Sequence, residues 1–207
     1  NLLFFHTGGK QGTQVSRAVG KSVSLQQLNG ASREEFVSAL RPLFNNETWP
    51  LELAWESRPF GDVNELRAAI QVAVLTADDS RRAALIHDYP AMDKLLLADA
   101  DEAATISADR GSLGLTDLDD VQTERITELS AAYRERFDMP FVAYLDTNDT
   151  VDRVIDAGVR RLANSPEQEY RTALGEIVEI ANDRFDILLA DANPVRSSWD
   201  RKFTEVD

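Results

Sequence analysis

Few side chains in this 207-residue chain could transfer a proton at neutral pH. The sequence holds two histidines, His6 and His87, which lie far apart, and it holds no cysteine. It therefore offers no thiolate nucleophile and no cysteine zinc site, and we expect no histidine metal site. An unperturbed histidine has a pKa of about 6.5 and can both take and give a proton, which makes His87 a candidate. An unperturbed tyrosine, with a pKa of about 10, can donate a proton but is a poor base, which limits Tyr89 to donation. An enzyme built on these residues would work without a metal.

Arg184 is the candidate for binding an anion. It falls within the apolar stripe of a predicted helix over residues 165–188, and this place turns its guanidinium inward. The alternative is that Arg184 pairs with a nearby acid, Asp183 or Glu179. The apolar residues of the stripe are Tyr170, Ala173, Leu174, Ile177, Ala181 and Leu188.

The elements that must position these side chains are predicted to be helices. Two capping boxes, Ser32 with Glu35 and Ser165 with Gln168, each precede apolar residues at helical spacing. Pro42 is expected to kink or end the first of these helices. Further helices are predicted to start at Asp62 and to cover residues 80–87, 119–137 and 150–162.

Other stretches are less regular. Residues 94–115 show no clear period, and residues 139–145 form a short apolar segment that looks extended. Trp49, Trp55 and Phe60 are expected to pack in the core or at a corner. The helix over 150–162 is expected to bury Val151, Val154, Ile155, Val159 and Leu162.

The chain as a whole is predicted to be all-α, a single-domain bundle of about seven or eight helices over residues 24–207. Residues 1–23 are expected to be a flexible N-terminal arm or a remnant of the expression vector. Residues 8–13 superficially suggest a phosphate loop, but the spacing of their lysine and glycines fails that pattern.

The composition limits the kinds of partner that the protein can bind. The net charge of −14 opposes nucleic-acid binding, because phosphates must be met by a basic face. No run of apolar residues is long enough to span a membrane, and the C-terminus carries neither a prenylation signal nor a peroxisomal ending. We therefore expect a cytoplasmic protein that associates with neither nucleic acid nor membrane.

Five blocks of sequence occur in a recognisable order: residues 28–36, 49–60, 129–142, 161–164 followed by Glu167 or Glu169, and 173–184. Residues 129–142, for example, follow the pattern L-N-x-x-Y-x-x-R-F-G-F-P-F-V at most positions. In order and spacing the blocks resemble the 2-oxo-4-hydroxy-4-carboxy-5-ureidoimidazoline (OHCU) decarboxylase family, whose members act last on the urate-to-allantoin route. The resemblance implies decarboxylation of a small anionic heterocycle without a cofactor.

The resemblance also implies where a site would lie. Tyr89 falls on the family's catalytic histidine, directly before Pro90, and His87 lies two positions early. Arg184 matches the family arginine that faces the substrate. The residues whose backbone amides would hold the anion are Phe141, Val142 and Ala143.

Two further site positions depend on the alignment of residues 106–115. If Gly114 and Leu115 are the anchor, Asp109 falls on the family's glutamate and Arg110 on its glutamine. A slip of one residue would instead place Ser107 on the family's serine. Asp109 and Arg110 could also simply pair with each other at the surface.

The substituted positions leave alternatives open. His87 is either an exposed helix end or a replacement for the missing imidazole, and Tyr89 is either a packed tyrosine or a proton donor lining the pocket. The substrate would be OHCU or a related ureido or imidazoline acid. The alternative function is an inactive family member that serves as a ligand-binding or interaction module. The resemblance also allows a homodimer.

Overall fold

The computed structural model describes residues 22–97, 118–146 and 149–189, and this part of the chain is helical. One isolated bridge, between Val23 and Leu189, joins its two ends. The all-α prediction is confirmed. The helices are α1 (Leu25–Gly30), α2 (Arg33–Leu40), the 3-10 helix η1 (Arg41–Leu43), α3 (Trp49–Trp55), α4 (Val63–Thr76), α5 (Asp79–His87), α6 (Met92–Leu97), α8 (Asp120–Phe137), α9 (Val151–Arg161) and α10 (Pro166–Leu188).

The predicted helix starts are confirmed where a capping residue marks them. Ser32 caps α2 and Ser165 caps α10, each with the reciprocal glutamate or glutamine bond of a capping box. Asp62 caps α4 through the Glu65 backbone amide. Pro42 lies in η1, directly after α2 has ended. Local side-chain to backbone bonds therefore set these boundaries.

Three short helices are not predicted by the sequence pattern. They are α1, α3 and α6, with six, seven and six residues. A helix of two turns places too few apolar residues on one face to display a period. The α6 helix occupies the start of the stretch 94–115, which was expected to be irregular, and residues 98–117 lie outside the described part of the chain.

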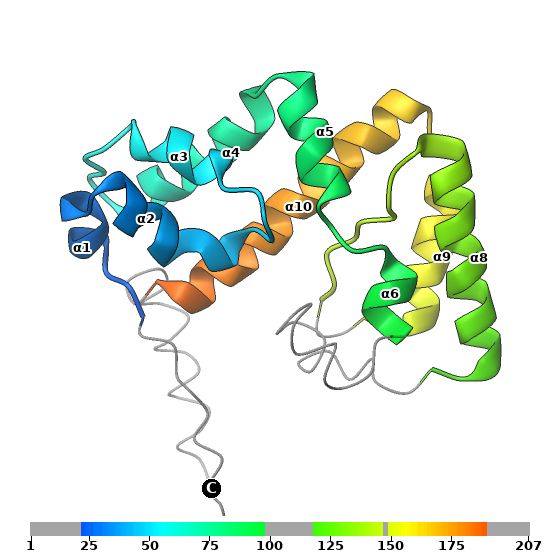
Figure 1. The fold of residues 1–207 in the computed structure, drawn as a ribbon. Coiled ribbons are helices and arrows are strands. Elements are labelled where there is room, and N and C mark those ends of the chain that lie inside the picture. Colours follow the sequence, from blue (N-terminus) through cyan, green and yellow to red (C-terminus); the bar gives the residue numbers. More distant parts are fainter. Residues whose placement is uncertain (1–21, 98–117, 147–148, 190–207) are drawn as a thin grey trace, which may run out of the picture.

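The long helix α10 organises the molecule (Figure 1). Helices α1 to α4 lie beside its C-terminal half, whereas α5, α8 and α9 lie near its N-terminal half. The larger apolar cluster joins α1 to α5 with α10, and the smaller one joins α6, α8 and α9. The segment 139–146, which has no regular secondary structure, contributes Met139 and Val142 to the larger cluster and Phe141 to the smaller. This segment thus lies at the junction of the two clusters.

The block of residues 49–60, which holds two tryptophans and ends in Arg-Pro-Phe, makes a packed corner, as expected. The Arg58 guanidinium carbon lies 4.2 Å from the centre of the Trp55 ring, and Arg58 Nη1 donates to the Ala31 carbonyl oxygen at 2.5 Å. The Asn29 side chain exchanges two hydrogen bonds of 2.9 Å with the backbone of Phe60. These bonds tie the end of α1 to the loop between α3 and α4.

The predicted buried face of α9 is wrong at one position. Val159 is 53% exposed, and Gly158 is buried in its place. A Cβ at Gly158 would lie 2.4 Å from Leu129 Cδ2 and 3.0 Å from the Phe141 ring. The helix therefore approaches α8 through its glycine, and this close contact turns Val159 outward.

We expect Gly158→Ala to destabilise the fold by about 1–3 kcal/mol, because the added methyl group would push Leu129 and the Phe141 ring apart. Urea unfolding would measure the loss. Gly175→Ala is the matched control, since a Cβ there meets nothing within 4 Å and alanine favours a helix over glycine by about 0.5–1 kcal/mol. Equal effects of the two substitutions would contradict the close contact.

Candidate active site

The end of α5 and the turn after it carry the two predicted proton donors. Tyr89 is 7% exposed and belongs to the larger apolar cluster, and Pro90 beside it is half-buried. His87 is the last residue of α5 and is exposed. The structure therefore sets the phenol inside the protein and the imidazole on its surface.

Asp88 fixes this turn against the loop that precedes α3. Its carboxylate accepts from the backbone amide of Asn46 at 2.6 Å, from the Asn46 side chain at 2.7 Å and from the backbone amide of Glu47 at 3.3 Å. Hydrogen bonds to a charged acceptor are roughly twice as strong as those between neutral groups. The residue between His87 and Tyr89 thus holds the turn in place.

Arg184 reaches the same loop from α10. Its Nη1 donates to the Leu43 carbonyl oxygen and to Asn45 Oδ1, each at 3.3 Å. The residue is half-buried, which agrees with a place beside the apolar stripe of α10. These two bonds tie the guanidinium to the end of η1 and to the loop that follows it.

Asn45 joins the arginine to the turn. Its Oδ1 accepts from Arg184, and its Nδ2 donates to the Asp88 carbonyl oxygen at 3.4 Å. Arg184 lies 139 residues from Asn45 in the sequence, and Asp88 lies 43 residues from it, so Asn45 brings two predicted site elements together. Sequence reasoning missed Asn45 and Asp88, and the only local signal was the pair Asn45–Asn46 between two helical stretches.

The third predicted element, Phe141 to Ala143, follows α8, and its Val142 shares the larger apolar cluster with Tyr89. Phe141 and Val142 are buried, and Ala143 is half-buried. Arg161 Nη1 donates to the Val142 carbonyl oxygen at 2.9 Å, and the Tyr144 backbone amide donates to Glu176 Oε2 at 2.7 Å. Side chains of α9 and α10 therefore hold the backbone of this segment on both sides of Ala143.

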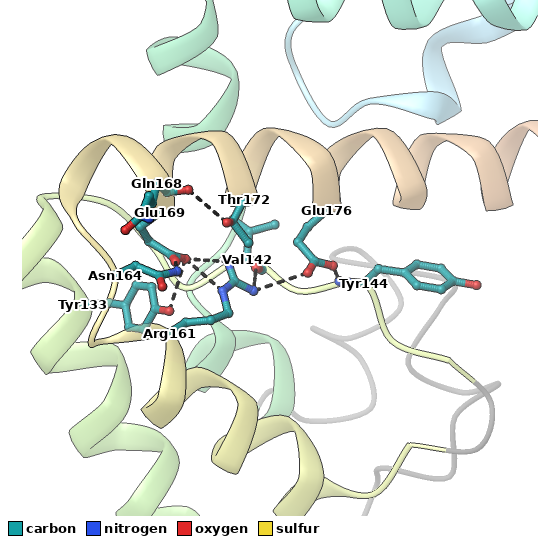
Figure 2. Close-up of polar contacts among 9 residues, drawn as sticks. All are labelled: Tyr133, Val142, Tyr144, Arg161, Asn164, Gln168, Glu169, Thr172 and Glu176. Carbon is teal, nitrogen blue, oxygen red and sulfur yellow. Dashed lines mark hydrogen bonds and ion pairs between the residues drawn. The ribbon is translucent and has the colours of Figure 1, made fainter.

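A buried carboxylate lies beside Val142 of this segment (Figure 2). Glu169 is 0% exposed and accepts four bonds: from Arg161 Nε at 2.9 Å, Arg161 Nη2 at 2.5 Å, Asn164 Nδ2 at 2.7 Å and the Tyr133 hydroxyl at 3.2 Å. The sequence left Glu167 and Glu169 as alternatives for this position. The structure selects Glu169, because Glu167 is exposed in the first turn of α10.

This network sets the protonation of Tyr133. Burial raises the pKa of Tyr133 above its ordinary value of 10.0, while the Arg161 guanidinium opposes this and the Glu169 carboxylate adds to it. As pH rises, the phenol ionises earlier in the unfolded chain than in the folded protein. Its ionisation therefore leaves the free energy of unfolding unchanged below pH 10 and lowers it as pH rises further.

We expect the urea midpoint of the wild type to fall more steeply with pH above 10 than that of Tyr133→Phe, which has no phenol to ionise at this position. Unfolding curves at a series of alkaline pH values would measure both slopes. Parallel slopes for the two proteins would contradict the raised pKa.

Two predicted site residues, Asp109 and Arg110, lie outside the described residues, as does Ser107. Within the described ranges, no group of three or more histidine or acidic side chains is placed to hold a metal ion. Among the helices of those ranges, none has the length and apolar character needed to cross a membrane.

The comparison that decides the family covers both the turn and α10. The profile of the family described as OHCU decarboxylase matches residues 29–186, and so includes Asn45, Tyr89, the segment 139–146 and Arg184. The chain belongs to the OHCU decarboxylase family.

Individual members of the OHCU decarboxylase family agree over most of their length. The chain is 37% identical to the 2-oxo-4-hydroxy-4-carboxy-5-ureidoimidazoline decarboxylase of Haloferax volcanii over 164 residues, which are 78% of this chain and 94% of that protein. It is 32% identical to the enzyme of the same name from Mus musculus over 181 residues, 84% of this chain and 98% of that protein.

A solved structure shares the fold. The crystal structure of (S)-allantoin synthase aligns with a TM-score of 0.62 at 22% identity and covers 81% of this chain. The aligned part is 54% of that chain, so this protein spans about half the length of that neighbour. The all-α architecture inferred from the sequence is therefore that of a known OHCU decarboxylase-like fold.

Proposed function

We propose that this protein decarboxylates OHCU, or a closely related ureido or imidazoline acid, without a cofactor. The family and the near-complete overlap with proteins named OHCU decarboxylases support the reaction. The observation that carries the assignment of the site is the Asn45 bridge, which links Arg184 to the turn bearing Tyr89. The cation for the substrate carboxylate is thereby hydrogen-bonded to the turn that carries the proposed proton donor.

The reaction requires the protein to hold the substrate carboxylate, to donate a proton and to orient the substrate. Arg184 would hold the carboxylate through the planar, charge-assisted bonding that guanidinium groups make with such anions. When the bond from carbon to the carboxylate breaks, carbon dioxide leaves and the electron pair spreads into the ring and carbonyl groups of the substrate. A donor then returns one proton to that carbon. Asp109 would orient a substrate hydroxyl or amide, and Arg110, Pro90 and the amides of Phe141, Val142 and Ala143 would complete the site.

Tyr89 is the better candidate for the donor. It is buried beside the Asp88 turn, whereas His87 is exposed at the helix end. A phenol is a weak acid that can donate its proton to a carbanion-like intermediate. This assignment makes the proton donor of this chain different from the family histidine.

We expect Tyr89→Phe to lower kcat by about 10²–10⁴, because general acids typically contribute that much. His87→Gln should retain most activity if the exposed imidazole does not replace the donor. Steady-state rates and circular dichroism spectra of both variants would measure the effect. The opposite order of the two variants would assign the proton to His87. Tyr89→His combined with Asp109→Glu tests the alignment, since an unchanged rate would mean that the site is placed wrongly.

The function itself is tested with OHCU made enzymatically from urate. Decarboxylation should exceed the spontaneous rate, and the allantoin formed should be optically active. An uncatalysed reaction in achiral solvent protonates both faces of the planar intermediate equally and gives no optical rotation. A rate at the spontaneous level, with tight binding of allantoin-like compounds, would instead identify a ligand-binding member of the family.

The proposal includes the partners of the protein. The substrate is a small anion, and the net charge of −14 argues against nucleic acid as a second partner. A homodimer and a cytoplasmic location are part of the same proposal. Light scattering coupled to gel filtration would measure the first, and fractionation of the native cells the second.

A further inference from the structure

We infer that Arg161 and Glu176 are positioning residues that clamp the backbone of residues 142–144 and so aim the substrate-facing amides of the segment 141–143. This inference rests on the proposed function. Its starting point is that a stretch with no regular secondary structure is held by side chains from two different helices (Figure 2).

Arg161, at the end of α9, acts on one side of Ala143. Its Nη1 donates to the Val142 carbonyl oxygen at 2.9 Å, and its guanidinium carbon lies 5.0 Å from the centre of the Phe141 ring. The same guanidinium is held by two bonds to the buried Glu169 carboxylate. Since that carboxylate is itself fixed by Tyr133 and Asn164, the donor to Val142 has little freedom to move.

Glu176, on α10, acts on the other side. Its Oε2 accepts from the Tyr144 backbone amide at 2.7 Å, and its Oε1 accepts from Arg161 Nη1 at 3.5 Å. The Tyr144 ring extends away from the carboxylate, so the contact is made to the backbone (Figure 2). One guanidinium and one carboxylate thus form hydrogen bonds to consecutive peptide units on either side of Ala143, and they also bond to each other.

Such a clamp replaces the ladder of hydrogen bonds that a helix or strand would supply. Without it, the peptide planes between residues 142 and 144 would be held only by the packing of the Phe141 and Val142 side chains. A displacement of about 1 Å at a reacting centre can reduce the rate by about 10²-fold. We therefore assign the two side chains to the orientation of the site and not to proton transfer.

Glu176 is the better position for a test. Its side chain is 28% exposed, whereas any change at Arg161 would leave the fully buried Glu169 without its cation. Glu176→Ala removes the acceptor for the Tyr144 amide, and alanine is well tolerated in a helix. Glu176→Gln keeps an amide oxygen that can accept the same bond. Glu135→Gln, at an exposed position of α8, is the matched surface control.

Steady-state kinetics, product optical purity and amide hydrogen exchange of residues 141–145 should be measured on the full chain. We expect Glu176→Ala to lower kcat by about 10–100-fold with KM changed by less than about threefold, to lower the optical purity and to speed exchange of the segment. Glu176→Gln should recover most of each quantity, and Glu135→Gln should match the wild type.

Three outcomes would overturn the inference: wild-type kcat and optical purity in Glu176→Ala, equal impairment of Glu176→Gln and Glu176→Ala, or faster exchange without any kinetic change. Inactivity of the wild type would refute the proposed function instead. Hydrogen exchange would then judge the clamp alone, with unchanged exchange in Glu176→Ala counting against it.

Discussion

Replacing Glu169 by glutamine will destabilise the fold by about 3–5 kcal/mol, the range found when one partner of a buried ion pair is removed. Glu169 accepts from four donors on three side chains, and glutamine offers one acceptor oxygen in place of two. Its amide hydrogens would face the amide of Asn164, and the Arg161 charge would lose its main counterion. This loss is a large share of the 5–15 kcal/mol that is typical of a whole domain.

Urea unfolding of Glu169→Gln beside Glu167→Gln would measure this effect. Glu167 is exposed in the same helical turn, and a change there should stay within about 0.5 kcal/mol. The double variant Glu169→Met with Arg161→Met should lose less than the sum of its single variants, because removing both charges leaves neither one buried alone. Equal losses for Glu167→Gln and Glu169→Gln would show that the buried network does not support the fold.

Replacing Arg184 by alanine will lower kcat/KM on the proposed substrate by about 10²–10³, which corresponds to about 3–4 kcal/mol of lost transition-state stabilisation. Truncating one partner of a hydrogen-bonded charge pair costs about 2–5 kcal/mol, and the substrate carboxylate would be that partner. Arg184→Lys should fall between the wild type and alanine, because an ammonium keeps the charge but not the planar pair of donors.

A structural effect must be separated from this loss of binding. Arg184 also donates to the Leu43 carbonyl oxygen and to Asn45, so its removal loosens the loop before α3. Asn45→Ala removes that link while it keeps the cation, and it should reduce kcat/KM less than Arg184→Ala does. Partial recovery of Arg184→Ala by added guanidinium salt would support direct binding of the substrate. An Asn45→Ala variant as impaired as Arg184→Ala would make Arg184 a support for the loop alone.

Features that depend on neighbouring residues could be predicted from the sequence. The starts of α2, α4 and α10 follow from Ser32, Asp62 and Ser165, because each of these side chains bonds to a backbone amide three residues ahead. The long helices α8 and α10 show the apolar period over many turns. The short helices α1, α3 and α6 do not, since two turns are too few to reveal one face.

Features that depend on contacts between distant segments could not be predicted in this way. Gly158 is buried and Val159 is exposed because α9 meets α8 and Phe141 at that point, and the helical period allows either residue to face inward. The choice between Glu167 and Glu169 was open for the same reason. Glu169 is the one whose carboxylate meets Arg161, Asn164 and Tyr133 once α8, α9 and α10 have packed.

By itself, the amino-acid sequence determined that this chain is an all-α protein of the OHCU decarboxylase family, because caps, periods and motif order are local or linear properties. It also determined that a tyrosine, not a histidine, precedes Pro90. Only the tertiary structure decided how the candidate site is assembled. Asn45 bonds to Arg184 across 139 residues and to Asp88 across 43, and such pairs arise only when α10 and the turn after α5 both pack against the loop before α3.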